Sequence, residues 1–175
     1  MTVNNYELSI IKKLTFFFGQ QKISSLVYLY DEDDNEMLDH VIFFEKEDSS
    51  NLGLYIRGLN PLFSINKIHE LDDFNLFASY EKISEYKEEF KLSIEYICFH
   101  ISSEYNELLG VYLSNSNNSQ SILILFLQDK IELFKNCNYS EARKMLENRC
   151  LQEDYISYEK YHTEDWRKLI TTDEK

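Results

Sequence analysis

Hydrophobic residues near the N-terminus recur at helical spacing. The positions that lie three or four residues apart, and so share one face of a helix, are Leu8, Ile11, Leu14 and Phe18. Gly19 follows the last of them, and glycine is common just after a helix C-terminus. The pattern predicts an amphipathic helix from about residue 5 to Gly19.

From Ile23 the chain changes to short apolar runs rich in β-branched and aromatic residues. Runs of this kind, bounded by polar turns, are typical of strands. They occur at residues 26–30, 41–44 and 52–56, and an acidic stretch separates the first two. These runs predict three antiparallel strands in a meander.

The middle of the chain has a less regular pattern. Between residues 60 and 88 helix and strand templates score similarly, and a short helix is favoured at about residues 79–88. Alternation of apolar and polar residues then predicts a strand from Phe90 to Cys98 with one covered face. Apolar residues of the other parity continue to Ile101, which indicates burial on both faces or a bulge.

The second half of the chain contains three further apolar runs. Residues 108–113, 121–127 and 131–134 predict strands. The continuous run 121–127 is typical of a central strand, because both of its faces are apolar. The short polar segment between the last two runs predicts a tight hairpin.

Helices are predicted near the C-terminus. The first follows a capping sequence at Asn138, and its apolar stripe consists of Ala142, Met145, Leu146 and Cys150. The order of the tail after about residue 161 stays open, because it is either loosely ordered or forms a last short helix. Thr163 could cap that helix, which would carry Trp166, Leu169 and Ile170.

These elements predict an α+β fold with a mainly antiparallel sheet, an N-terminal helix and C-terminal helices. A chain of 175 residues can bury about 70% of its unfolded surface. With one Pro and four Gly, no flexible linker divides it. We therefore expect residues 1–175 to form a single domain.

The charge balance changes the range of expected partners. There are 31 Asp and Glu against 18 Lys and Arg, and the net charge is −13. Such a chain repels phosphate backbones, so direct binding to nucleic acid or to an anionic membrane is disfavoured. The same charge speeds encounter with a basic protein, although solubility alone is an equally open explanation.

The cysteines and apolar runs indicate a cytoplasmic, reduced protein. Cys98, Cys137 and Cys150 are odd in number and form no CxxC pair, so a disulfide framework is not expected. The apolar run at residues 14–18 is too short for a secretory signal, and no run approaches the roughly 20 residues of a membrane span.

Motifs for common catalytic or cofactor sites are not found. Asp31, Asp33 and Asn35 fit the first positions of a calcium loop, but Glu36 and Ile42 stand where Gly and Glu are required. The histidines form no metal-ligand pair, and His100 is expected to be packed beside Cys98 on one strand face. No GxSxG elbow or phosphate-binding glycine loop occurs, so no cofactor is predicted.

Tyrosine is the remaining residue type of interest. Tyrosines that recur among acids can pack in a core or anchor a protein partner, because Tyr is enriched in interfaces. They are Tyr86, Tyr96, Tyr105, Tyr112, Tyr139, Tyr155, Tyr158 and Tyr161.

Two acidic stretches stand out, Asp31-Glu32-Asp33-Asp34-Asn35-Glu36 and Glu70-Leu71-Asp72-Asp73. In these stretches and in its overall character, the chain resembles the immunity proteins of bacterial toxin systems, including contact-dependent growth inhibition and colicin-like systems. The resemblance implies a protein that binds a cognate toxin domain, often a basic nuclease, and occludes its active site. It involves no alignable motif, so no family residue is carried over.

A nuclease carries Lys and Arg that hold phosphates, and carboxylates of an inhibitor can occupy that surface. The residues expected to contact such a basic partner are Asp31, Glu32, Asp33, Asp34, Glu36, Glu70, Asp72 and Asp73. Two other functions stay open: a hydrolase that uses paired carboxylates or a divalent metal, and a phage or mobile-element inhibitor or accessory subunit that binds a host protein.

Overall fold

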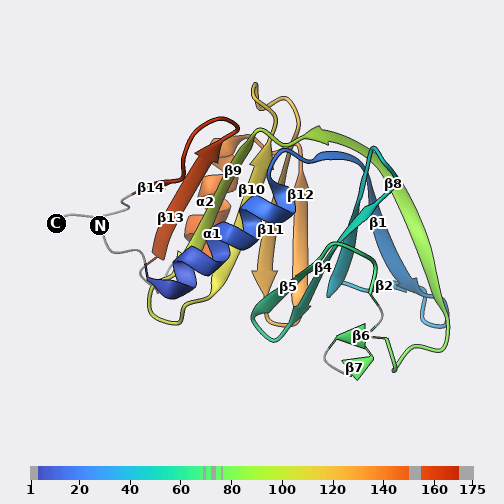
Figure 1. Ribbon diagram of the computed structural model, residues 1–175. Coiled ribbons are helices and arrows are strands. Elements are labelled where there is room, and N and C mark those ends of the chain that lie inside the picture. Colours follow the sequence, from blue (N-terminus) through green and yellow to red (C-terminus); the bar gives the residue numbers. More distant parts are fainter. Residues whose placement is uncertain (1–3, 69, 72–73, 76, 150–154, 170–175) are drawn as a thin grey trace.

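The computed structural model describes residues 4–68, 70–71, 74–75, 77–149 and 155–169. Within these residues the protein is an α+β structure dominated by antiparallel strands (Figure 1). Two helices are present in the described part: α1 (Asn5–Phe18) and α2 (Tyr139–Arg149).

The strands form two six-stranded sheets and a small two-stranded ribbon. The first sheet has the order β2-β1-β3-β4-β5, with β8 on the other edge of β1, and the second has the order β12-β11-β10-β9-β13-β14. The first sheet consists of β1 (Lys22–Asp31), β2 (Glu36–Met37), β3 (Val41–Lys46), β4 (Asn51–Arg57), β5 (Asn60–Ser64) and β8 (Ile83–Ser93). The second consists of β9 (Tyr96–Ser102), β10 (Leu108–Ser114), β11 (Ser121–Leu127), β12 (Lys130–Lys135), β13 (Tyr155–Tyr161) and β14 (Arg167–Leu169). The ribbon pairs β6 (Glu70–Leu71) with β7 (Phe74–Asn75).

The predicted N-terminal helix is confirmed, and a reciprocal cap fixes its start. The Asn4 side chain accepts a hydrogen bond from the Glu7 backbone N–H (2.8 Å), and the Glu7 carboxylate accepts one from the Asn4 N–H (3.1 Å). Its buried face contains Leu14 and Phe18. Gly19 follows at the C-terminus, donating to the Thr15 carbonyl (3.0 Å).

The second sheet is covered on both faces. The first helix crosses one face and α2 lies on the opposite face (Figure 1). In β9, Ile97, Phe99 and Ile101 therefore join the core shared by α1 and both sheets, whereas Cys98 belongs to the cluster under α2. The two apolar parities noted in this segment thus indicate burial on both faces.

The strand predicted from Phe90 to Cys98 is in fact two strands in different sheets. The chain leaves β8 at Ser93 and enters β9 at Tyr96. At the crossing, Ile94 donates to the carbonyl of Gln21 (2.9 Å) and Glu95 donates to that of Ser114 (2.9 Å). The same chain segment therefore joins the two sheets.

The helix predicted at residues 79–88 is wrong, because most of this segment belongs to β8. This strand pairs with β1 along its whole length, from Lys22 opposite Ser93 to Asp31 opposite Ile83. Glu and Lys favour helices on their own, but propensity is weak where a neighbouring strand offers a complete set of hydrogen bonds.

The last short helix, with Thr163 as its cap, is also wrong. Residues 155–161 form β13 beside β9, and residues 167–169 form β14. Trp166 between them packs its ring against Phe99 (centroids 5.1 Å apart) and donates from Nε1 to Thr15 Oγ1 (2.8 Å). The apolar spacing here reflects contacts with a sheet and α1. Ile170 lies outside the described residues.

The remaining predicted elements are confirmed. The meander is formed by β1, β3 and β4, and the hairpin by β11 and β12. Helix α2 begins after a reciprocal cap in which Glu141 donates its N–H to Asn138 Oδ1 (2.9 Å). Cys150 lies outside the described residues.

Candidate functional site

The first acidic stretch forms an exposed turn between β1 and β2, called here the acidic turn (residues 31–36). Asp31 differs from its neighbours, because it is buried and its Oδ1 accepts a hydrogen bond from the Asp33 N–H (3.0 Å). Asn35 has a left-handed backbone (φ 54°), which asparagine tolerates better than most residues. The exposed acids of the turn are Glu32, Asp33, Asp34 and Glu36.

Among the described residues, the acidic turn makes no ion pair, in contrast to the acids of β8. In β8, Glu85 pairs with Lys67 (2.8 Å) and Glu88 pairs with Lys135. The turn therefore presents four exposed carboxylates that no ion pair neutralises among the described residues. Such a charge attracts cations and basic surfaces at low ionic strength.

The second acidic stretch begins in the small ribbon. Glu70 is the first residue of β6 in the small ribbon. Asp72 and Asp73 lie outside the described residues.

A groove of about 410 Å³ lies beside the acidic turn. It lies between β12 on one side and β1 to β3 on the other, and we call it the Tyr28 groove. Its lining includes Tyr28, Met37, Asp39, Ile42, Leu133 and Lys135. Ile42 and Leu133 belong to or pack on the core between the sheets, so the floor is apolar.

Tyrosines extend one wall of the groove towards solvent. Tyr28 and Tyr86 are opposite each other in β1 and β8, with ring centroids 6.4 Å apart, and Tyr30 packs edge-on against Tyr86 at 6.3 Å. Tyr86 is 55% exposed, and Met37 at the groove is 47% exposed. Large amphipathic side chains of this kind are suitable anchors for a protein partner.

A polar bridge spans the mouth of the groove. The Tyr28 hydroxyl donates to Glu88 Oε2 (3.2 Å), and the other Glu88 oxygen pairs with Lys135 Nζ of β12. Burial and the Glu88 carboxylate raise the pKa of Tyr28 well above its usual value, so the phenol keeps its proton. The bridge joins three strands that are far apart in the sequence.

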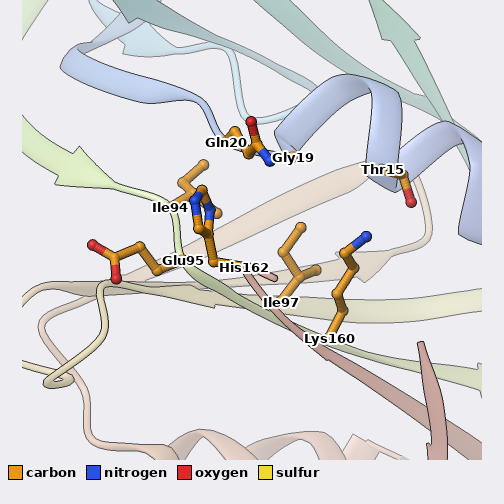
Figure 2. Close-up of a pocket in the computed structure, with 8 residues that line it drawn as sticks. All are labelled: Thr15, Gly19, Gln20, Ile94, Glu95, Ile97, Lys160 and His162. Atoms are coloured by element: carbon orange, nitrogen blue, oxygen red, sulfur yellow. The ribbon is translucent and has the colours of Figure 1, made fainter. Parts of the chain in front are cut away.

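A smaller pocket of about 120 Å³ lies between the end of α1 and strands β9 and β13. Figure 2 shows the side chains of Lys160, in β13, and His162, directly after this strand, rising towards α1, whereas the Glu95 carboxylate points away from them. Gln20 at its rim has a left-handed backbone (φ 59°). The pocket combines charges of both signs and is too small for a protein segment.

The candidate base His100 and the candidate nucleophiles Ser157 and Cys98 are buried. His100 and Ser157 lie within 3.2 Å of each other, but both are at most 2% exposed. Burial lowers the pKa of His100 to about 4 and raises the pKa of the Cys98 thiol to about 11. Within the described part of the chain, no group of three or more His, Cys, Asp or Glu could hold a metal ion. These residues have the environment of packed core side chains.

The tyrosines singled out in the sequence fall into three groups, of which one, Tyr139 and Tyr155, is half-buried. Tyr96, Tyr112 and Tyr158 are at most 4% exposed and belong to the core. Tyr86, Tyr105 and Tyr161 are exposed, and of these Tyr86 lies beside the groove. Sequence reasoning missed the groove itself, although two tyrosines at alternate positions directly before the acidic stretch were a usable signal.

No helix among the described residues is long and apolar enough to cross a membrane. Comparison with protein-family models, curated proteins and solved structures finds no significant match for this chain.

Proposed function

We propose that this protein binds a basic protein partner through the Tyr28 groove and the acidic turn, as an immunity protein binds and occludes a toxin domain. One observation carries the proposal. A groove with an apolar floor, lined by Tyr28 and flanked by the exposed Tyr86, lies directly beside four exposed carboxylates that make no ion pair among the described residues.

The two features have complementary physical roles. Charges at the rim of an interface mainly raise the association rate, whereas buried aromatic anchors slow dissociation. The acidic turn supplies the first effect and Tyr86 with Met37 supplies the second. Neither effect requires a catalytic group or a cofactor.

A toxin domain that acts on nucleic acid is the partner class that fits this charge best. Its active site must carry Lys and Arg to hold phosphates. The carboxylates of the acidic turn can form charge-assisted hydrogen bonds with those groups in place of phosphate oxygens. Binding would then block the substrate path, and the toxin would lose its activity in the complex.

The proposal predicts a strong effect of neutralising the acidic turn. Affinity capture from the native lysate, followed by mass spectrometry, identifies the partner, which is then purified for stopped-flow kinetics. Replacing the four exposed acids by their amides (E32Q, D33N, D34N and E36Q) should lower the association rate about tenfold at low salt. The salt dependence of that rate should also become flatter, because steering is screened by ions.

A matched variant controls for net charge. It carries the same number of amide substitutions at exposed acids elsewhere, namely E104Q, E141Q, E164Q and D165N. This variant should associate at nearly the wild-type rate. Equal slowing of both variants, or a partner that keeps its activity in the complex, would contradict the proposal.

A further inference from the structure

Strand β12 has one hydrogen-bonded neighbour and one open edge. It ends the order of the second sheet and pairs only with β11 within the described part of the chain. Its other edge faces the Tyr28 groove, because every residue of β12, from both faces of the strand, lines that groove. An open strand edge presents unpaired backbone groups that another extended chain can use.

The outward-facing groups of β12 can be identified from its register. In an antiparallel pair, residues alternate between hydrogen bonding to the partner strand and pointing away from it. Asn136 donates to Ser121 on β11 (2.8 Å), whereas Ile131 donates away from β11 to the carbonyl of Asp39 (2.7 Å). By this alternation the N–H and C=O groups of Leu133 and Lys135 point into the groove.

The first position on this edge is already taken by the protein itself. The backbone carbonyl of Asp39, in the connection between β2 and β3, accepts the hydrogen bond from the Ile131 N–H. In the described residues no backbone hydrogen bond reaches the outward groups of Leu133 or Lys135. The free edge therefore starts where the intramolecular cap ends, and it runs along the groove floor.

The side chain of Lys135 lies across this edge and pairs with Glu88. A lysine on an edge strand discourages indiscriminate pairing with other chains. The carboxylate of Glu88 can also form an ion pair with a Lys or Arg of an incoming segment. A basic segment can therefore replace Lys135 on Glu88, whereas an acidic or apolar segment cannot.

We propose that the partner inserts an extended basic segment into the Tyr28 groove as an added strand on β12. Main-chain groups of the segment form hydrogen bonds with the main chain of Leu133 and Lys135. One of its Lys or Arg side chains replaces Lys135 in the ion pair with Glu88. The adjacent acidic turn attracts the remaining positive charge of the segment. This inference rests on the proposed function and names the binding mode of the same site.

The test uses a defined probe, a capped eight-residue peptide of alternating valine and lysine, with a valine–glutamate peptide as its matched control. Calorimetry gives the affinities for the wild type and for two variants of one residue, K135M and K135P. Both variants free Glu88, but only K135P lacks the outward N–H. Because that N–H does not bond to β11, proline there leaves the sheet ladder intact.

The lysine peptide should bind the wild type and the glutamate peptide should not. K135M should bind severalfold more tightly than the wild type, because Glu88 has lost its competitor. K135P should bind about three- to tenfold more weakly than K135M, which is the effect expected for one main-chain hydrogen bond. In the wild-type complex, the amide protons of Leu133 and Lys135 should gain protection from exchange.

A second measurement does not depend on K135P folding. N-methylation of every other peptide residue removes the N–H groups of one edge of the added strand, and two such patterns exist, one for each edge. The pattern that blocks the edge facing β12 should abolish binding, and the pattern that blocks the opposite edge should retain it. If both patterns bind, or if the amides of Leu133 and Lys135 stay unprotected, strand addition is overturned. If the captured basic partner still binds, and associates more slowly with the acidic-turn variant than with the wild type, the proposed function stands without strand addition. If neither the partner nor the peptide binds, both proposals fail.

Discussion

Replacing Phe99 by alanine is expected to lower the free energy of unfolding by about 3–5 kcal/mol, the usual cost of removing a fully buried aromatic ring. Phe99 is 0% exposed. Its ring stacks on Tyr158 of β13 (5.3 Å, 18° between planes) and contacts Trp166 edge-on (5.1 Å). The cavity left by alanine lies where α1, β9 and the C-terminal strands meet. Urea denaturation measures the loss as a lower midpoint with an unchanged slope.

The matched control is the same substitution at Phe16, which is 71% exposed on the outer face of α1. Phe16→Ala should change the free energy of unfolding by no more than about 0.5 kcal/mol. Phe99→Leu, a milder change at the buried site, should fall between the two. If Phe99→Ala costs no more than Phe16→Ala, the packing of the C-terminal strands against β9 does not contribute as described.

The elements that the sequence predicted correctly have local signals that agree with their tertiary surroundings. Helix α1 has both an apolar stripe and a reciprocal cap at Asn4 and Glu7, and these are readable within a few residues. The hairpin of β11 and β12 has an apolar run and a left-handed turn residue at Asp129 (φ 54°). In such segments the spacing of apolar residues is sufficient to predict the secondary structure, because the same face is buried whichever element packs against it.

The wrong predictions occur where pairing with a distant strand decides the conformation. Strand β8 contains a run of Glu and Lys, whose ion pairs with Glu45, Lys67 and Lys135 on other elements cannot be foreseen from spacing. Its partner β1 lies about sixty residues earlier in the chain, as the hydrogen bond from Tyr28 to Glu88 shows. Local propensity favoured a helix there, and the tertiary pairing overrode it.

The candidate site was predictable only in part for the same reason. The acidic turn was visible as a run of carboxylates between two strands, and the structure places four of its five acids on the surface. Asp31 is buried, and its side chain accepts a hydrogen bond from the Asp33 N–H within the turn. The groove beside it combines β1, β2, β3 and β12, and only the sheet topology brings these strands together.

The lining of the groove combines an apolar floor with polar and charged groups that a partner can contact. Tyr28 lines the groove, and its ring lies beside that of Tyr86, which in turn contacts Tyr30, so amphipathic rings continue from the groove towards its surroundings. The Glu88–Lys135 pair satisfies the charges at its mouth in the free protein. Exposed ion pairs contribute little to stability, so exchanging this pair for one with a partner costs little.

A second large effect is expected from pH, through the buried imidazole of His100. This side chain is 2% exposed, lies against the Ser157 hydroxyl and stacks on the Tyr155 ring (4.9 Å). Burial lowers its pKa to about 4 from an ordinary value of 6.5, with Arg143 adding to the decrease and the Phe99 backbone and Glu147 opposing it. Between these two values the unfolded chain binds the proton and the folded chain does not. Stability contributed by neutral His100 is therefore complete above pH 6.5 and is lost as the pH falls towards 4.

The expected loss is roughly 3 kcal/mol across this range, at about 1.4 kcal/mol for each unit of pKa difference. Urea denaturation at intervals from pH 7.5 to 4 measures it as the difference between the wild type and His100→Gln, which cannot titrate and should show a flatter pH dependence. Ser157→Ala is the matched control, because it removes the hydroxyl beside the ring but keeps the imidazole. It should be less stable at every pH and still lose stability steeply below pH 6.5. If His100→Gln retains the wild-type slope, the pH dependence arises from the carboxylates rather than from the buried histidine.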